Sequence, residues 1–184
     1  MEDLKENTKQ PENEPGVTIV EVTEDNKEML LGLRAVIDKD FNYDGLESEI
    51  DGYISNDKFG KKAFITLEND HPVGYVEVII NNNEGELSPS EQYLKDHNIN
   101  LNELATLSRI GLIEEKRGEG GGTKLIEKAK VFAKESGKSG IWTDYLAAKE
   151  KLVKFYEKNG FKQVGDDYLD TKKAKNRRVA VCKF

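Results

Sequence analysis

A glycine-rich turn over residues 117–123 is the feature that most restricts how this chain can fold. Four of the five residues 118–122 are glycine, the residue type that loses most backbone entropy on folding. The turn follows a predicted strand, 103–113, and precedes an apolar stripe at helical spacing that begins at Leu125. This order brings the free N–H groups of a helix start close to a ligand, and it favours a phosphate or pyrophosphate site over a plain flexible loop.

Two common phosphate-binding motifs do not fit this turn. The Walker motif ends in Gly-Lys-Ser or Gly-Lys-Thr. Residues 137–139 have that ending, but Phe132 stands where the motif needs its first glycine. The dinucleotide motif G-x-G-x-x-G, read from Gly118, ends on Thr123 instead of glycine. The phosphate ligand must therefore be recognised in another way.

Composition narrows the class of protein further. The 184 residues carry a net charge of −7, which argues against a nucleic-acid binder or an anionic-membrane binder. One cysteine and two histidines exclude a disulfide framework and make a metal centre improbable. No apolar run is long enough for a transmembrane helix or a signal peptide, so we expect a cytoplasmic protein. We expect residues 1–15 to form a disordered acidic tail and residues 16–184 to form a single domain.

Hydrophobic periodicity predicts alternating strands and helices along that domain. We expect strands at 16–22, 62–68, 73–80, 103–113, 141–146, 161–168 and 178–184, and helices within 23–37, 46–54, 123–136 and 147–159. Residues 81–102 are polar and form a probable insertion, with one helical turn around 91–96. A polar, basic loop, 170–177, joins the last two strands.

Two motifs at a characteristic separation resemble the GNAT superfamily of acyl-CoA-dependent N-acyltransferases. The first motif, Arg/Gln-x-x-Gly-x-Gly/Ala, is similar to residues 117–122. The second, Tyr-Glu-Lys-x-Gly-Phe, resembles residues 156–161. The likeness is clear from about Ala105 to Phe161. It implies an α/β (α+β) fold with a mixed, mostly antiparallel central sheet of about six to seven strands, flanked by about four helices.

The resemblance also implies a site. In the family the glycine turn holds the coenzyme A pyrophosphate, a neighbouring strand pairs with the pantetheine arm, and a tyrosine protonates the leaving thiolate. Carried over to this sequence, these roles make Tyr156 and Thr106 the catalytic candidates. Thr106 stands at the position where many members have a glutamate that is proposed to act as the general base. The implied cofactor-binding residues are Leu112, Ile113, Arg117, Gly118, Gly120, Gly121, Gly122, Thr123 and Lys149. No metal is implied.

The activity that the resemblance implies is N-acetylation. The acetyl group would move from acetyl-CoA, as cosubstrate, to the primary amine of a small molecule or peptide, directly within a ternary complex. We expect a monomer or homodimer that binds neither nucleic acid nor membrane. Threonine cannot act as a general base, and Lys149 and Leu152 also depart from the family pattern. These departures keep open the alternative of a non-catalytic acyl-CoA-binding or sensing domain with the same fold.

Overall fold

The computed structural model describes residues 16–184, apart from 39–44, 56–58, 82–85 and 172–173. The predicted tail, 1–15, lies outside the described residues. The helices are α1 (Lys27–Ile37), α2 (Leu46–Ile54), α3 (Pro89–Asp96), α4 (Gly121–Glu135) and α5 (Glu150–Lys158), with 3₁₀ turns at Leu101–Glu103 and Glu114–Lys116. The strands are β1 (Val17–Glu21), β2 (Lys61–Glu68), β3 (His71–Ile79), β4 (Leu104–Leu112), β5 (Gly140–Leu146), β6 (Lys162–Gln163), β7 (Tyr168–Asp170) and β8 (Lys175–Lys183).

The eight strands of the described residues belong to one sheet. Its order is β1-β2-β3-β4-β5-β8-β6, and β7 pairs with β8 outside this path. Every pairing is antiparallel except that of β4 with β5, which is parallel. The predicted mixed, mostly antiparallel sheet is therefore confirmed. The described residues form eight strands and five helices, whereas six to seven strands and about four helices were expected. The additional helix lies between β3 and β4, and the additional strand lies in the C-terminal part of the chain.

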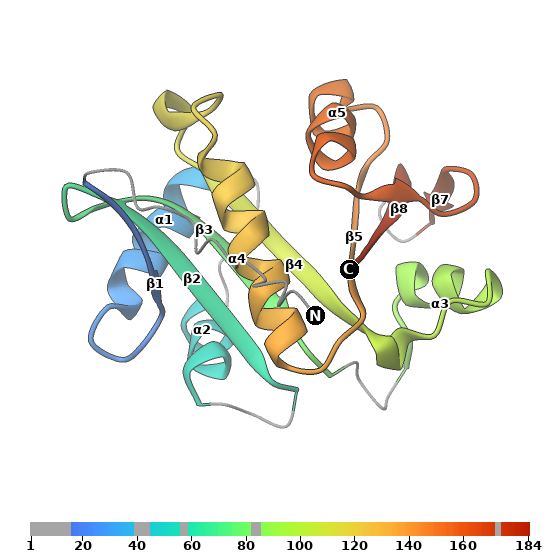
Figure 1. The fold of residues 1–184 in the computed structure, drawn as a ribbon, viewed down its shortest axis with the longest axis horizontal. Coiled ribbons are helices and arrows are strands. Elements are labelled where there is room, and N and C mark those ends of the chain that lie inside the picture. The colour runs from blue at the N-terminus through green and yellow to red at the C-terminus, as the bar shows by residue number, and fades with distance from the viewer. Residues whose placement is uncertain (1–15, 39–44, 56–58, 82–85, 172–173) are drawn as a thin grey trace, which may run out of the picture.

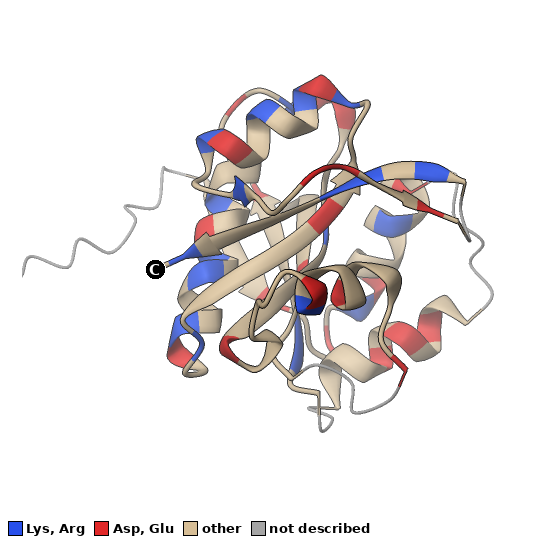
Figure 2. Cartoon of the chain, turned by 90° about the vertical axis from the view of Figure 1, so that its right-hand side faces the viewer, with Lys and Arg blue, Asp and Glu red and all other residues tan. Residues whose placement is uncertain are grey.

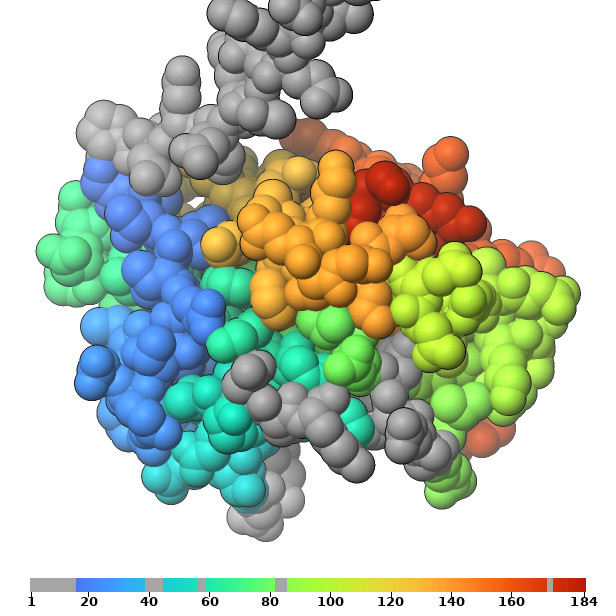
Figure 3. Space-filling model, turned by 60° about the horizontal axis from the view of Figure 1, so that its bottom comes forward, coloured from blue at the N-terminus to red at the C-terminus, as the bar shows by residue number. Residues whose placement is uncertain are grey.

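Helices cover both faces of the sheet (Figure 1). On one face α4 and α5 pack over the central strands, around Leu125, Ile126 and Tyr156. On the other face α1 and α2 cover β2 and β3 through Leu30, Ile50 and their neighbours. Helix α3 covers β5 and β8 through a separate apolar cluster. Figure 3 shows the segment that carries α3 (yellow-green) on the opposite side of the molecule from α1 and α2 (blue to cyan).

The insertion between β3 and β4 contains more structure than predicted. It forms an eight-residue helix, α3, instead of one turn. Ser88 caps the helix, since its hydroxyl accepts from the Glu91 N–H while the Glu91 carboxylate accepts from the Ser88 N–H. Proline follows the cap at the first helical position, where its fixed φ suits a helix. The buried Leu94 then attaches the helix to the apolar cluster over β5 and β8.

The C-terminal part differs from the predicted strand at 161–168 and loop at 170–177. Gly165, at φ +55°, interrupts the strand, so that β6 and β7 are separate short strands. Strand β8 begins at Lys175, within the predicted loop. Two arginines of this basic stretch find carboxylate partners: Arg177 pairs with Asp144 and Arg178 with Asp167. Basic and acidic residues are interspersed over this side of the molecule (Figure 2).

Candidate active site

The two central strands pair briefly and then separate. Strands β4 and β5 are in register only from the Leu104–Gly140 pair to the Thr106–Trp142 pair. Beyond it β4 continues along β3 to Leu112, whereas β5 continues along β8 to Leu146. We call this divergence the fork; it is visible between β4 and β5 in Figure 1. It leaves the edge of β4 that faces β5 unpaired beyond Thr106, where an extended ligand can pair with a strand backbone.

At the end of β4, the backbone groups of Leu112 and Ile113 are directed to opposite edges of the strand. The Ile113 N–H donates to the Val73 carbonyl at 2.9 Å, on the side of β3. Because successive residues of a strand direct their backbone groups to opposite edges, those of Leu112 are directed to the fork. There the Leu112 carbonyl accepts a hydrogen bond from Arg117 Nε at 3.1 Å. Of the two predicted pantetheine-binding residues, Leu112 thus has the backbone that faces the open edge.

The glycine-rich turn leads into α4 with a left-handed backbone. Gly118 and Gly120 have φ values of +94° and +88°, which residues with a Cβ rarely adopt. Gly122 is buried, and a Cβ at this position would come within 3.0 Å of the Phe155 ring. The Thr123 N–H donates to the Gly120 carbonyl at 3.0 Å, whereas N–H groups earlier in a helix have no acceptor within the helix. The amides of this turn can therefore bind an anion.

Charged side chains around the turn are partly engaged already. Lys116 forms ion pairs with Glu68, at 2.5 Å, and with Glu119, at 3.7 Å. These hydrogen bonds raise the pKa of Lys116. Arg117 is exposed, and so is Lys149, which stands at the start of α5. The predicted phosphate site thus depends on backbone N–H groups more than on unpaired cations.

Tyr156 lies on the face of the sheet that carries α4 and α5. Its ring stacks on Tyr145, with centroids 4.6 Å apart, and meets the edges of Phe155 and Phe161 at 5.3 Å. Burial raises the pKa of Tyr156 to about 12, although a hydrogen bond with the Thr143 side chain opposes the shift. The phenol therefore remains protonated at neutral pH, as a proton donor must.

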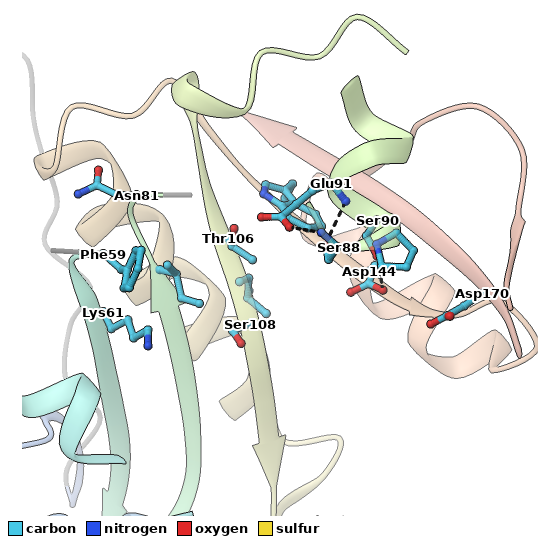
Figure 4. Close-up of a pocket in the computed structure, with 14 residues that line it drawn as sticks. Phe59, Lys61, Asn81, Ser88, Ser90, Glu91, Thr106, Ser108, Asp144 and Asp170 are labelled. Atoms are coloured by element: carbon cyan, nitrogen blue, oxygen red, sulfur yellow. Dashed lines mark hydrogen bonds between the residues drawn. The ribbon is translucent and has the colours of Figure 1, made fainter. Parts of the chain in front are cut away.

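A cavity of about 450 Å³ lies on the opposite face, over the start of the fork. Figure 4 shows its walls: Phe59 and Lys61 from the side of β2, Thr106 and Ser108 in the middle, and residues of α3 beside Asp144. Trp142 and Asp144 line it, whereas Thr143 lies beside Tyr156, because side chains alternate between the faces of a strand. Thr106 and Tyr156 thus approach the fork from opposite faces.

The part of the cavity wall that α3 supplies was not predicted. Ser90 of α3 donates to Asp144 Oδ2 at 2.8 Å, and its hydroxyl lies 2.6 Å from the Tyr168 hydroxyl. Arg177 binds the same carboxylate oxygen of Asp144. The sequence does contain a signal for this wall: Ser88 and Glu91 have the spacing of a capping box, which marks a helix start. Nothing in the local pattern indicates that this helix reaches Asp144, 54 residues further along the chain.

A buried ionic cluster lies beside the cavity, beneath α1 and α2. Glu77 is fully buried and pairs with Arg34 and Arg109, each at 3.3 Å. The Tyr53 hydroxyl donates to Glu77 at 3.0 Å, and Glu49 pairs with both arginines. Burial raises the pKa of Glu77, and the two guanidinium groups oppose that shift. The cluster fixes α1 and α2 to β3 and β4 and so stabilises one wall of the cavity.

The described residues contain neither a metal-binding cluster nor a membrane-spanning helix. No group of three or more His, Cys, Asp or Glu side chains in the described ranges is arranged to hold a metal ion. Among the same residues, no helix has the length and apolar character needed to cross a membrane.

Comparison with known proteins identifies the class. The sequence model of the acetyltransferase (GNAT) domain matches residues 60–163, more than half of the chain. The match includes the fork, the glycine-rich turn and Tyr156. The chain therefore belongs to the GNAT acetyltransferase family.

Solved structures agree with this assignment. A protein from Bacillus anthracis assigned as a streptothricin acetyltransferase, solved with acetyl coenzyme A, is 25% identical with a TM-score of 0.57, over 73% of this chain and 67% of that one. An acetyltransferase from Thermus thermophilus is 18% identical, with a TM-score of 0.64, over 91% and 97%. A GNAT acetyltransferase from Elizabethkingia anophelis with acetyl-CoA bound is 12% identical, with a TM-score of 0.64, over 93% and 100%. The last two show the shared fold.

Proposed function

We propose that the chain transfers an acetyl group from acetyl-CoA to a primary amine, by direct attack within a ternary complex. The observation that carries this proposal is the fork, which has the glycine-rich start of α4 at one end and the cavity at the other. A thioester lying between the strands would be reached by an amine from the cavity on one face and by Tyr156 from the other.

The coenzyme would be held mainly by backbone groups. Amides of Gly118, Gly120, Gly121, Gly122 and Thr123 would bind the pyrophosphate at the start of α4, where the helix dipole favours negative charge. Exposed Arg117 and Lys149 would add positive charge. The pantetheine arm would pair with the open edge at Leu112, beside Ile113. The complex of the Bacillus anthracis relative with acetyl coenzyme A supports this choice of cosubstrate.

The chemistry requires little more than alignment. The lone pair of a neutral amine forms a bond to the acetyl carbon, the C–S bond breaks, and the resulting ammonium loses a proton. Holding the two reactants together contributes about 7–11 kcal/mol in favourable cases. Tyr156 donates its phenol proton toward the departing sulfur, and Thr106 orients the amine or a water molecule that accepts the amine proton.

The acceptor class and cellular setting belong to the same proposal. The cavity volume suits a small molecule or the end of a peptide. The relative from Bacillus anthracis is assigned to streptothricin, a small molecule. We propose a cytoplasmic enzyme that works as a monomer or homodimer and needs neither nucleic acid nor membrane.

Release of free thiol from acetyl-CoA tests the function. We expect amine-dependent thiol release that follows the formation of an N-acetyl product, without an acetylated form of the enzyme. Binding of coenzyme A with no thiol release, across a panel of primary amines, would support the non-catalytic acyl-CoA-binding alternative. An acetylated enzyme that passes its group on to the amine would contradict direct transfer.

A further inference from the structure

The two walls of the cavity carry opposite charge. Lys61 lies on one wall, and Glu91, Asp144 and Asp170 lie on the other (Figure 4). Arg177 approaches the acidic wall from β8 and neutralises part of it through its pair with Asp144. Lys61 disfavours a cation near its own wall, so a positively charged ligand is directed toward α3 and β5.

Asp144 presents a fixed carboxylate with one open oxygen. Ser90 and Arg177 both bind Oδ2. In the part of the chain that the structure describes, Oδ1 has no hydrogen-bond or ion-pair partner, and the side chain is 26% exposed. Two contacts on one oxygen hold the carboxylate in place, so that the other oxygen can accept a donor from the cavity.

Trp142 supplies an independent indication of a ligand. It lines the same cavity two residues before Asp144 and is only 4% exposed. Its indole N–H has no hydrogen-bond partner among the described residues. Leaving a buried donor unpaired costs about 1–3 kcal/mol. The nitrogen atom itself is buried, so an oxygen atom of a bound ligand would pair this N–H once the indole ring shifts toward the cavity.

A nitrogen that stays charged on Asp144 cannot at the same time attack the thioester. A neighbouring carboxylate favours the charged form of an amine and so keeps its lone pair protonated. The attacking nitrogen must be neutral. An acceptor that keeps an ammonium group on Asp144 therefore needs a second basic nitrogen, separate from the reacting one.

We propose that the acceptor is a compact diamine, with one ammonium group on Asp144, a hydroxyl or carbonyl oxygen on Trp142, and its other amine at the fork. This inference rests on the proposed acetyl transfer. Trp142 pairs with Thr106 at the start of the fork, and Asp144 lies about 7 Å further along the strand, at about 3.3 Å per residue. That spacing requires only a short chain between the two nitrogens, with the oxygen between them.

The charge on the second nitrogen is tested first. We expect kcat/KM for 1,3-diaminopropane to exceed that for propylamine by at least about tenfold, the effect of one charge-assisted hydrogen bond. Asp144→Asn should abolish this preference. Asp166→Asn, which removes the same charge from an exposed residue outside the cavity, should keep it. Equal kcat/KM values for the two amines, or an unchanged preference in Asp144→Asn, would overturn the proposal.

A pair of diamines that differ only in one hydroxyl group tests whether a ligand oxygen binds the Trp142 N–H. We expect 1,3-diamino-2-propanol to have a lower KM than 1,3-diaminopropane, and Trp142→Phe should remove this difference. The comparison in the unmodified protein decides the question even if the variant does not fold. A hydroxyl that gives no advantage in the unmodified protein would overturn the role of Trp142.

Failure of this inference can be distinguished from failure of the acetyl-transfer proposal. Acetylation of propylamine and 1,3-diaminopropane at equal rates would leave acetyl transfer intact and remove the diamine preference. Calorimetric titration of 1,3-diaminopropane into the protein with coenzyme A provides a readout without turnover. Tight binding of the diamine with no acetylation of any amine would support the site and contradict the enzyme.

Discussion

At the scale of single residues, the surroundings of a side chain decide what it can do. Tyr156 is held among three aromatic rings, and burial raises its pKa to about 12. An unperturbed tyrosine has a pKa of about 10 and an ordinary thiol one of about 8.5. The phenol therefore stays protonated, and it can stabilise the negative charge that develops on the departing sulfur by donating a hydrogen bond to it.

Removing this hydroxyl should separate catalysis from binding. We expect Tyr156→Phe to lower kcat by about 100-fold, within the usual range for an acid–base group, while coenzyme A affinity stays within twofold. Thiol release gives kcat, and the melting temperature with coenzyme A reports binding. The matched control is Tyr145→Phe, which removes a phenol from the adjoining ring. An unchanged kcat in Tyr156→Phe would exclude the phenol as the acid.

The pH dependence of kcat follows from the same residue. Because the pKa of Tyr156 is raised, the phenol stays protonated from pH 7 to pH 10, and loss of its proton should not lower kcat in that interval. With a monoamine such as propylamine, we expect kcat/KM to rise with pH as the acceptor amine loses its proton, and then to level off. A fall of kcat with an apparent pKa near 10 would show an unperturbed phenol and contradict this assignment.

Glu77 illustrates the opposite case, a buried charge with a structural role. Removing one partner of a buried ion pair leaves the others uncompensated, at a cost of about 3–5 kcal/mol. We expect Glu77→Gln to lower the free energy of unfolding by about 3 kcal/mol, measured by urea denaturation. Glu47→Gln, on the exposed side of α2, should change it by less than about 0.5 kcal/mol. Equal effects of the two changes would mean that the cluster contributes no net stability.

At the scale of secondary-structure elements, the glycine-rich turn and helix α3 shape the site. The glycine-rich turn lets the start of α4 approach a ligand, and α3 supplies a wall to the cavity. Each depends on a backbone detail of its own. The turn needs a positive φ at Gly118 and Gly120, and α3 needs the capping box of Ser88 and Glu91.

Substitution of two glycines by alanine should change the stability of the protein in opposite directions. Gly120→Ala forces a Cβ into a left-handed backbone and should lower stability by about 1 kcal/mol and weaken coenzyme A binding. Gly32→Ala lies in the middle of α1 with open space around it, and it should raise stability by about 0.8 kcal/mol without affecting binding. Urea denaturation and coenzyme A titration measure both quantities. Stabilisation by Gly120→Ala would contradict the left-handed turn.

At the scale of the whole molecule, charge is unevenly divided. The net charge is −7, and residues 1–15 hold five acidic and two basic residues, hence −3 of it. The described domain is therefore less acidic than the total suggests. Its exposed Arg117 lies in the glycine-rich turn of the proposed phosphate site, whereas carboxylates gather on one wall of the cavity. A polyanionic cosubstrate and a cationic acceptor would approach different faces of the sheet.

Coenzyme A should stabilise the folded protein by mass action. At 100 times its Kd it adds about 2.7 kcal/mol, which corresponds to a rise in Tm of about 5–10 °C for a domain of this size. Adenosine, which lacks the pyrophosphate and the pantetheine arm, should raise Tm by less than 2 °C at the same concentration. Thermal unfolding followed by circular dichroism checks both. Equal shifts for the two ligands would argue against a phosphate-binding turn.

Elements with local signals could be predicted from the amino-acid sequence alone. The glycine turn and the apolar stripes of α4 and α5 follow from backbone geometry and helical periodicity, and the structure has each of them. The motifs at residues 117–122 and 156–161 also indicated the family that the comparisons show. The residues assigned to cofactor binding remain predictions.

Only the tertiary structure decided how distant residues meet. It brought Ser90 to Asp144, buried Glu77 between Arg34 and Arg109, and left the buried Trp142 N–H without a hydrogen-bond partner among the described residues. These contacts join residues more than 30 positions apart, so hydrophobic periodicity, which reports only which face of an element is buried, contains no information about them. The class of the protein could thus be predicted from local patterns, whereas the shape and charge of the acceptor cavity depend on how the sheet brings separate elements together.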